Sequence, residues 1–327
     1  MDARVLDTVE RCLAGGMIGV DEAIALMEYD SLSAEAAHIR WAAETIGRKA
    51  AGGIGQIYAQ IGVDAGPCPL GCAFCSLAAA NRHPGMPAGE VPLARIVEYA
   101  QVFDRAGVHL ITLMSTGAMR FARYLEIVRA VRDAVSDDMP LMANTADFNE
   151  EQAAQLKEAG VQAVYHADRL GEGEITGISP ERREATIDAA RGVGLAFMSA
   201  VEPVQQSSRA EDIAQAMARV IAQKPYCAGV GVLTAIPHGR EELAPISRAR
   251  GHFLAAIMRL MAGTSIPNGT GSGNVLWVDA GTNPRARDLP VDEAALRRDV
   301  ARQRKALIGQ EWIVPDRPLP GWFASRA

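Results

Sequence analysis

The sequence has no excess of positive charge, no long apolar run and few cysteines. Lys and Arg number 33 against 39 Asp and Glu, so the net charge is −6, which argues against a nucleic-acid-binding surface. No apolar run approaches the roughly 20 residues of a membrane-spanning helix. The charged start Met1-Asp2-Ala3-Arg4 lacks the apolar centre of a signal peptide. These absences predict no nucleic-acid partner, no membrane association and a cytoplasmic location.

Three of the five cysteines lie in one short segment, Cys68-Pro-Leu-Gly-Cys72-Ala-Phe-Cys75. So few cysteines in a cytoplasmic chain do not make a disulfide framework. Three thiolates from one loop can bind three irons of a cubane [4Fe–4S] cluster, because soft sulfur ligands suit iron–sulfur sites. The fourth iron then has no protein ligand from this loop and is free to bind a small chelating molecule. The other cysteines, Cys12 and Cys227, are interpreted as small buried apolar residues.

Two other metal sites are compatible with the same cysteines. A structural zinc site normally closes with four ligands, and His83 is the nearest candidate for the fourth. A conventional electron-transfer cluster would also need a fourth side-chain ligand. The spacing C-x3-C-x2-C favours the three-cysteine cluster with an open iron.

The chain as a whole predicts an α/β fold. Residues 1–52 form a helical lead, since Leu6, Val9 and Leu13 recur at helical spacing. Short apolar runs then alternate with amphipathic helices. The predicted strands are 56–63, 110–115, 141–145, 163–166, 196–201, 229–233, 264–267 and 275–279. The predicted helices are 90–106, 119–136, 149–159, 180–193, 208–223, 243–262 and 291–309. Eight strands alternating with helices predict a (β/α)8 TIM-type barrel over 53–310, with an N-terminal helical extension.

The C-terminal tail and the cysteine loop differ from the repeating pattern. Residues 311–327 carry Pro315, Pro318 and Pro320, which predicts an irregular tail. The cysteine loop follows the first strand, so it should lie at the C-terminal mouth of the barrel, where barrel enzymes build their sites. Gly66 suits a tight loop that wraps a metal centre.

Polar residues that follow the other strands are candidate ligand-binding residues at the same mouth. The second strand leads into the small residues Ser115, Thr116 and Gly117, which allow close approach of backbone to a ligand. Asn144 ends the third strand and offers an amide. Asp168 and Arg169 follow the fourth, where the carboxylate can accept from hydroxyls and the guanidinium can pair with a carboxylate. A surface ion pair is the alternative for these last two.

Three further residues are candidates for contact with a substrate. Glu202 follows the fifth strand, where a buried carboxylate needs a partner such as an amine or hydroxyl. Arg240 lies in the loop after the sixth strand, and a loop without a ligand role is the alternative there. Asp279 ends the eighth strand, where it is placed for an amino group inside the barrel.

The cysteine segment, with Phe74 before its last cysteine, resembles the signature of the radical S-adenosylmethionine (SAM) superfamily. The resemblance implies that Cys68, Cys72 and Cys75 bind a [4Fe–4S] cluster whose open iron chelates SAM. In that family one electron cleaves SAM to a 5′-deoxyadenosyl radical, which abstracts hydrogen from the substrate. It further implies a reductant such as flavodoxin or ferredoxin. Ser115–Gly117, Asn144, Asp168 and Arg169 then become SAM candidates, although the family's usual acidic residue is replaced by Ala118-Met119.

Nearly the whole chain resembles one branch, which holds biotin synthase, the hydrogenase maturases and methylornithine synthase. The likeness is greatest to methylornithine synthase, over 201–204, 237–250 and 274–285. It implies an enzyme that rearranges, cleaves or joins the carbon skeleton of a small, amino-acid-like molecule. Metal-cofactor maturation is an alternative. Sulfur insertion is disfavoured, because only two cysteines remain for an auxiliary cluster. A non-catalytic iron–sulfur electron carrier is the alternative outside enzymes.

Overall fold

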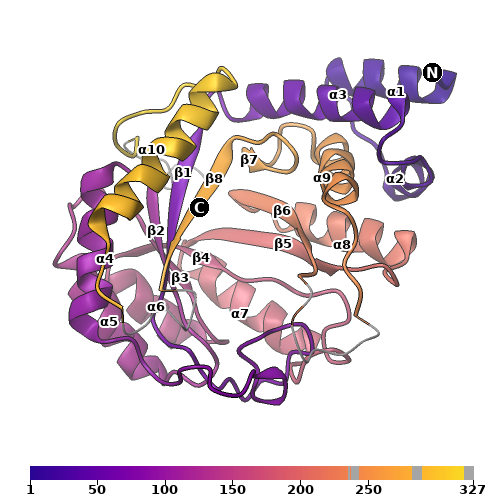
Figure 1. Cartoon of the computed structure of the whole chain (residues 1–327). Helices are drawn as coiled ribbons and strands as arrows, with labels where there is room; N and C mark the ends of the chain where they lie inside the picture. Colours follow the sequence, from indigo (N-terminus) through magenta and orange to yellow (C-terminus); the bar gives the residue numbers. More distant parts are fainter. Residues whose placement is uncertain (235, 237–242, 282–288, 320–327) are drawn as a thin grey trace.

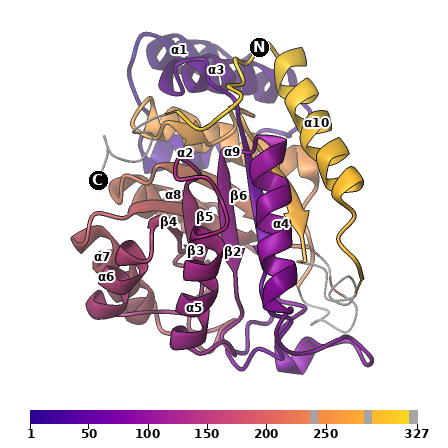
Figure 2. The same ribbon diagram turned by 90° about the vertical axis from the view of Figure 1, so that its left-hand side faces the viewer.

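Eight parallel strands form one sheet that curls into a nearly closed barrel with helices around it (Figures 1 and 2). The computed structural model describes residues 1–234, 236, 243–281 and 289–319. The strand order is β7-β6-β5-β4-β3-β2-β1-β8, so within these residues the sheet is open between β7 and β8. The predicted (β/α)8 TIM-type architecture is confirmed.

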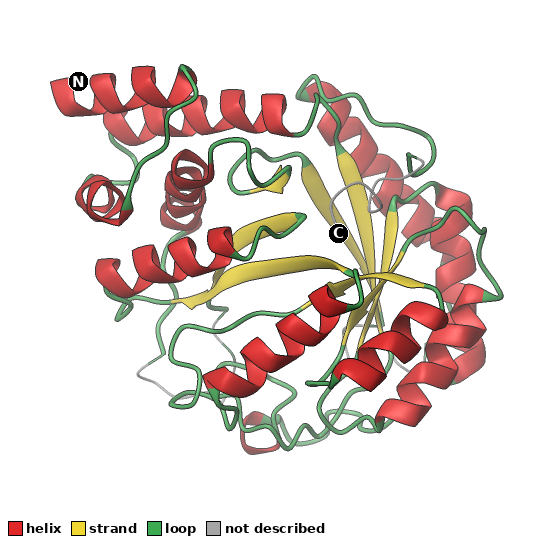
Figure 3. Ribbon diagram, turned by 180° about the vertical axis from the view of Figure 1, so that it is seen from behind, coloured by secondary structure: helices red, strands yellow, loops and turns green. Residues whose placement is uncertain are grey.

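The elements alternate regularly after the third helix (Figure 3). The strands are β1 Gln56–Gly62, β2 Leu110–Met114, β3 Leu141–Asn144, β4 Val161–Tyr165, β5 Ala196–Val204, β6 Cys227–Val232, β7 Asn268–Gly269 and β8 Val275–Ala280. The helices are α1 Ala3–Leu13, α2 Val20–Met27, α3 Ala34–Ala50, α4 Leu93–Ala106, α5 Phe121–Arg132, α6 Glu150–Glu158, α7 Pro180–Gly192, α8 Ala210–Ala222, α9 Arg248–Ala262 and α10 Glu293–Gly309, with a short 3-10 helix at Ala79–Asn81. β5 is longer than predicted, so Glu202 lies within it.

Alternating residues of the strands face either the helices or the barrel interior, as the two-residue period of a strand requires. The outward residues of β1 to β5 pack on α4 to α7 in one large apolar core. A smaller layer, which includes Tyr58, Met142 and Met198, fills the interior. A buried polar network lies below that layer, where Gln56 Nε2 donates to Asn268 Oδ1 at 3.0 Å.

The prediction for the seventh strand was wrong. Residues 264–267 do not pair, and β7 comprises only Asn268–Gly269. Pro267 has no N–H to donate to a ladder. The carbonyls of Gly263, Ile266 and Gly269 accept instead from the buried guanidinium of Arg259, at 2.5–3.0 Å. Burial lowers the pKa of Arg259 to about 10.

The three N-terminal helices pack on the outside of the barrel beside α8 and α9 (Figure 1). Their buried residues, among them Val5, Ile39 and Ile46, form one core with Phe253 and Ile257 of α9. The helical lead therefore buries its apolar face against the barrel rather than within itself. The domain limits at 52 and 310 stay predictions.

The chain after α10 returns to the base of the barrel. Ile313 pairs with Ile54 ahead of β1, and Trp312 is buried in the main core. His109, fully buried before β2, accepts from Ile57 N at 2.8 Å through Nδ1, and its Nε2 lies 2.8 Å from Pro315 O. Burial lowers the pKa of His109 to about 4. Among the described residues, no helix has both the length and the apolar character needed to cross a bilayer.

His109 predicts a pH-dependent loss of stability. The unfolded chain protonates this histidine below about pH 6.5, whereas the folded chain does so only near pH 4. The free energy of unfolding should therefore fall by about 3 kcal/mol between these values because of this residue. Urea unfolding of the apoprotein should show a shallower acid decline for His109→Gln. The exposed His252→Gln is the control, and parallel pH curves for wild type and His109→Gln would contradict the assignment.

Candidate functional site

The cysteine loop is shaped by one asparagine. The side-chain amide of Asn81, at the end of the 3-10 helix, lies 3.0 Å from each of the carbonyl oxygens of Cys72, Ala73 and Cys75. Cys68 N donates to Leu77 O at 2.8 Å and closes the loop. With three carbonyls turned toward one amide, the loop backbone is fixed before any metal is bound.

Contacts with two other loops hold the cysteine loop in place at the mouth. Ala73 N donates to Ile175 O at 2.8 Å in the loop after β4. Gly117 N, in the loop after β2, donates to Cys68 Sγ at 3.3 Å. A Cβ on Gly117 would lie 2.5 Å from Leu70 of the cysteine loop, so only glycine permits this approach.

A buried carboxylate joins the loops after β1 and β2. Asp64 Oδ1 accepts from Thr116 N at 2.7 Å, and its Oδ2 accepts from the Thr116 hydroxyl and from Gly66 N at 3.2 Å. A buried carboxylate requires donors of this kind, and Asp64 has three. Asp64 therefore fixes the segment Ser115–Gly117 relative to the cysteines.

A cavity of about 430 Å³ lies at this mouth. Nine of the residues predicted from the sequence line it: Cys68, Cys72, Cys75, Ser115, Thr116, Gly117, Asn144, Arg169 and Glu202. They come from the loops after β1, β2 and β4 and from the ends of β3 and β5. Residues separated by more than 100 positions in the sequence thus face one space.

Arg169 is held in this cavity by an acidic and an aromatic partner. Its Nη2 lies 3.6 Å from Glu202 Oε1, which also accepts from the Tyr165 hydroxyl at 2.7 Å. Its guanidinium carbon lies 5.6 Å from the ring centre of Phe74. Burial would lower the pKa of Arg169, but Glu202 and Tyr165 raise it above its ordinary value. Its Nε has no hydrogen-bond partner within the described chain, so one donor is free for a ligand.

A second arginine, also buried, lines the cavity. Arg183 of α7 donates from Nε to Glu172 Oε2 at 3.1 Å and from Nη1 to Asp147 Oδ1 at 3.0 Å. His166 Nε2 also lies 2.9 Å from that Asp147 oxygen. Burial alone would raise the pKa of Asp147, but His166 and Arg183 hold it below its ordinary value. This network joins α7 to the ends of β3 and β4.

The thiols fit a cluster in donor type and surroundings. Burial raises the pKa of Cys72 to about 11, with Arg169 acting in the opposite direction, and burial also raises that of Cys75. Iron binding must therefore displace the thiol protons. Each thiolate of a cubane binds its own iron, so the sulfurs need to face a common cavity rather than one point. The cysteines meet this condition beside a buried cation.

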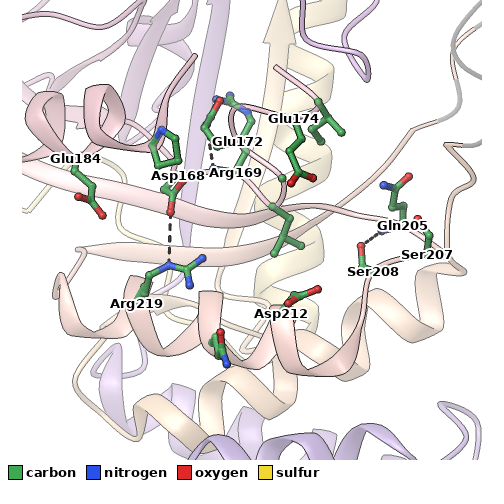
Figure 4. Close-up of a pocket in the computed structure, with 15 residues that line it drawn as sticks. Asp168, Arg169, Glu172, Glu174, Glu184, Gln205, Ser207, Ser208, Asp212 and Arg219 are labelled. Atoms are coloured by element: carbon green, nitrogen blue, oxygen red, sulfur yellow. Dashed lines mark hydrogen bonds and ion pairs between the residues drawn. The ribbon is translucent and has the colours of Figure 1, made fainter. Parts of the chain in front are cut away.

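Three predicted residues lie elsewhere. Asp168 lines a neighbouring groove of about 570 Å³, where its Oδ2 lies 3.6 Å from Arg219 Nε (Figure 4); burial raises its pKa. Asp279 lies near the end of β8 on its inward face, and its side chain is exposed. Its Oδ1 lies 3.5 Å from Gln60 Nε2, and partial desolvation by the surrounding protein raises its pKa. Arg240 lies outside the described residues.

The sequence analysis overlooked four residues of the site. Asp64 carried a usable signal, as a lone carboxylate in the otherwise uncharged segment before Cys68. Tyr165 is the last residue of β4 and precedes the predicted Arg169 in the chain, but nothing in the sequence indicates that it contacts Glu202. Asn81 and Arg183 read as ordinary surface residues. His83 does not line the cavity, and its Nδ1 lies 2.6 Å from Pro84 O, which disfavours it as a fourth metal ligand.

Comparison of the sequence with known families matches residues 66–201 to the family described as the radical SAM superfamily. Biotin synthase of Carboxydothermus hydrogenoformans is 28% identical over 174 residues, which are 50% of this chain and 51% of the relative. Biotin synthase of Nocardioides sp. is 26% identical over 193 residues, 57% of this chain and 51% of the relative. The chain thus spans about half the length of the curated relatives it matches.

Two solved structures share the fold over nearly the whole chain. Methylornithine synthase (PylB) matches with a TM-score of 0.78 and 14% identity, over 97% of this chain and 98% of that one. HydG, a maturase of the [FeFe]-hydrogenase, matches with a TM-score of 0.75 and 13% identity, over 98% of this chain and 77% of that one. At these identities the likeness concerns the fold.

Loss of the Asn81 amide should weaken metal retention. In Asn81→Ala three carbonyls lose their shared donor, which should cost about 2 kcal/mol of loop stability and weaken iron retention roughly 30-fold. Iron content after anaerobic reconstitution and partial chelation measures the effect. Asn149→Ala is the matched control, because Asn149 only caps α6. Equal iron retention in the two variants would show that the amide does not support the loop.

Proposed function

We propose that this chain, of which residues 66–201 match the radical SAM superfamily, is an enzyme that cleaves SAM and acts by radical chemistry on a small molecule. Proteins of this superfamily bind a [4Fe–4S] cluster and SAM. The observation that carries the proposal is the common cavity at the barrel mouth, which brings three thiols together with Arg169 and the loop Ser115–Gly117.

The cysteine loop supplies the metal ligands in this proposal. Cys68, Cys72 and Cys75 each bind one iron, and the cluster, when bound, supplies the electron that cleaves SAM. Arg169 offsets the negative charge of three thiolates in a buried site, where an unpaired charge would be costly. Phe74 covers the guanidinium and keeps water from it. A reductant such as flavodoxin or ferredoxin is the proposed source of the electron.

Residues around the cavity divide into those suited to SAM and those suited to a substrate. The free Nε of Arg169 is suited to a carboxylate oxygen of SAM. Asn144 and the segment Ser115–Gly117 offer amide, hydroxyl and backbone groups in the same space. Asp168, one residue from Arg169 but in the adjoining groove, remains a candidate for the ribose hydroxyls.

Two carboxylate side chains of the protein, Glu202 and Asp279, are proposed to bind the substrate. Glu202 and Tyr165 form a hydrogen-bonded pair that faces the cavity. The close fit of Glu202 depends on Gly231 of β6, where a Cβ would lie 2.7 Å from Glu202 Cβ. Asp279 has no cationic partner in the described chain and suits an amino group of the substrate. Arg240 is suited to a carboxylate of the substrate. This donor set suits an amino-acid-like substrate. That its carbon skeleton is rearranged, cleaved or joined is proposed from the resemblance of the sequence to methylornithine synthase.

The position of the spare cysteines bears on the alternatives. Cys12 is buried on α1 and Cys227 lies inside the barrel on β6. The described chain therefore does not bring these two together for an auxiliary cluster, so sulfur insertion of the biotin synthase type is not favoured. Maturation of a metal cofactor is the remaining alternative, since one structural neighbour is HydG.

SAM cleavage separates an enzyme from an iron–sulfur electron carrier. The reconstituted protein, incubated anaerobically with SAM and dithionite, should form 5′-deoxyadenosine. Cys72→Ala should abolish the product, because one iron loses its ligand. Cys12→Ala, which removes a thiol outside the site, should retain it. If wild-type protein with a fully loaded cluster forms no more product than Cys72→Ala does, the proposal that the protein is an enzyme is refuted.

Removing the charge of Arg169 should weaken SAM binding. A charge-assisted hydrogen bond contributes about 1.5–3 kcal/mol, so Arg169→Gln should raise the dissociation constant of SAM roughly 10- to 100-fold. Equilibrium dialysis of the reconstituted protein measures it, with Arg298→Gln on α10 as the matched control. An unchanged constant at normal iron content would remove Arg169 from the SAM site.

A further inference from the structure

A second cavity, of about 700 Å³, lies inside the barrel away from the cysteines. It begins at Tyr165 and Trp277, passes Cys227 and Gly229 of β6, and reaches α3 and α9 on the outside of the barrel. In Figure 1, α3 and α9 lie beside β7, at the end of the barrel opposite the mouth. This cavity is called the side chamber below.

The side chamber exists because β7 is too short to close the wall. Arg259 occupies the carbonyls of Gly263, Ile266 and Gly269, which would otherwise be available to a longer strand. After β7 the wall consists of the glycine-rich turn 269–273. Gly271 packs its backbone against α9, where a Cβ would lie 2.9 Å from Ala256 N. The opening is thus built into the fold by a buried cation and a tight turn.

The side chamber adjoins the cavity of about 430 Å³ that the cysteines line, called the cysteine cavity below, at two aromatic residues, because Tyr165 and Trp277 line both. The Tyr165 hydroxyl is held by Glu202 at 2.7 Å. The Trp277 ring meets Tyr58 edge to face, with ring centres 5.2 Å apart. A molecule in the side chamber would therefore border the cysteine cavity at these two residues.

The sizes of the two cavities indicate that each binds a different part of the reacting molecules. A cavity of a few hundred Å³ suits one drug-sized ligand. The cluster and SAM, when bound, would share the cysteine cavity of about 430 Å³, so the body of a substrate would need further space. The larger side chamber is the adjoining space within the described chain.

The walls of the side chamber indicate what it holds. Its inner wall is uncharged and includes Met198, Cys227 and Val275. Its basic, acidic and histidine residues, Arg40, Glu44 and His252, all come from α3 and α9 at the outer end. The buried Thr270 also lines it, and its hydroxyl has no hydrogen-bond partner in the described chain.

We propose that the side chamber binds the body of the substrate, a flat and largely apolar group, while the polar reactive end lies at Glu202. The substrate is then larger than a free amino acid, whose two charges the inner wall could not pair. Trp277 at the inner end and the half-exposed Trp41 at the outer end offer ring faces for such a group. To call the bound molecule a substrate rests on the proposed function. The existence of a binding site in the side chamber does not depend on that function.

One glycine allows the side chamber to be filled without strain. A Cβ on Gly229 meets no atom within 4 Å, and the residue lines the side chamber. Gly229→Leu therefore places a side chain in the empty space. Gly192→Leu is the matched control, because Gly192 is exposed at the end of α7 and its Cβ is equally unobstructed.

The probe is 4-bromophenol, a flat apolar ring whose bromine is located by anomalous scattering. With S-adenosylhomocysteine in the reconstituted protein, calorimetry should show the probe binding, and crystals should place bromine in the side chamber. Gly229→Leu should weaken binding by at least about tenfold, while Gly192→Leu should not. Iron content and thermal unfolding establish that each variant is folded.

The proposal is overturned if the probe does not bind, if bromine lies only in the cysteine cavity, or if folded Gly229→Leu binds it as tightly as wild type. The SAM-cleavage assay distinguishes this failure from failure of the proposed function. If wild type binds the probe in the side chamber but forms no 5′-deoxyadenosine, the binding site is supported and the radical chemistry is refuted. If it forms 5′-deoxyadenosine but does not bind the probe there, the radical chemistry is supported and the binding site is refuted.

Discussion

The site depends on one buried carboxylate. Asp64 connects the loop that carries the cysteines to the loop after β2, through Thr116 and Gly66. Each loop alone is a flexible connection with several accessible conformations, and ordering it costs conformational entropy. A carboxylate without a cationic partner in the interior is stable only when donors surround it, so the two loops must keep this arrangement together. The Cys68 sulfur and Gly117 N come within 3.3 Å as a result.

Buried charge is balanced on the other side of the cavity. Arg169 and Arg183 lie between the carboxylates Glu202, Glu172 and Asp147. Breaking such a pair leaves an uncompensated charge and is costly, which makes this region rigid around the thiols. Arg169 remains incompletely satisfied, since its Nε lacks a partner in the described chain. An unsatisfied buried donor beside three thiols is consistent with a site that is completed by a charged ligand.

The barrel wall is incomplete for a local reason. Pro267 cannot donate within a ladder, and Arg259 binds three carbonyls that flank β7. The two-residue strand that results leaves space between β6 and β8, and the N-terminal helix α3 borders that space with Arg40 and Trp41. The segment 264–267, predicted as a strand, is therefore an unpaired connection ahead of β7. The error arose because its buried Ile266 packs under helices rather than in the sheet.

The sequence by itself determined the alternation of strands and helices, the three cysteines in one loop, and the placement of that loop after the first strand, because local periodicity and spacing carry this information. It also identified Ser115, Asn144, Arg169 and Glu202, because parallel strands of a barrel end at one face. Only the tertiary structure decided that Asp168 faces a different groove, that Asn81 supports the cysteine loop, that Arg183 joins α7 to the ends of β3 and β4, and that a chamber opens beside β7. Those features depend on which side chains meet in three dimensions, whether they are a few or hundreds of residues apart, and no local pattern encodes such meetings.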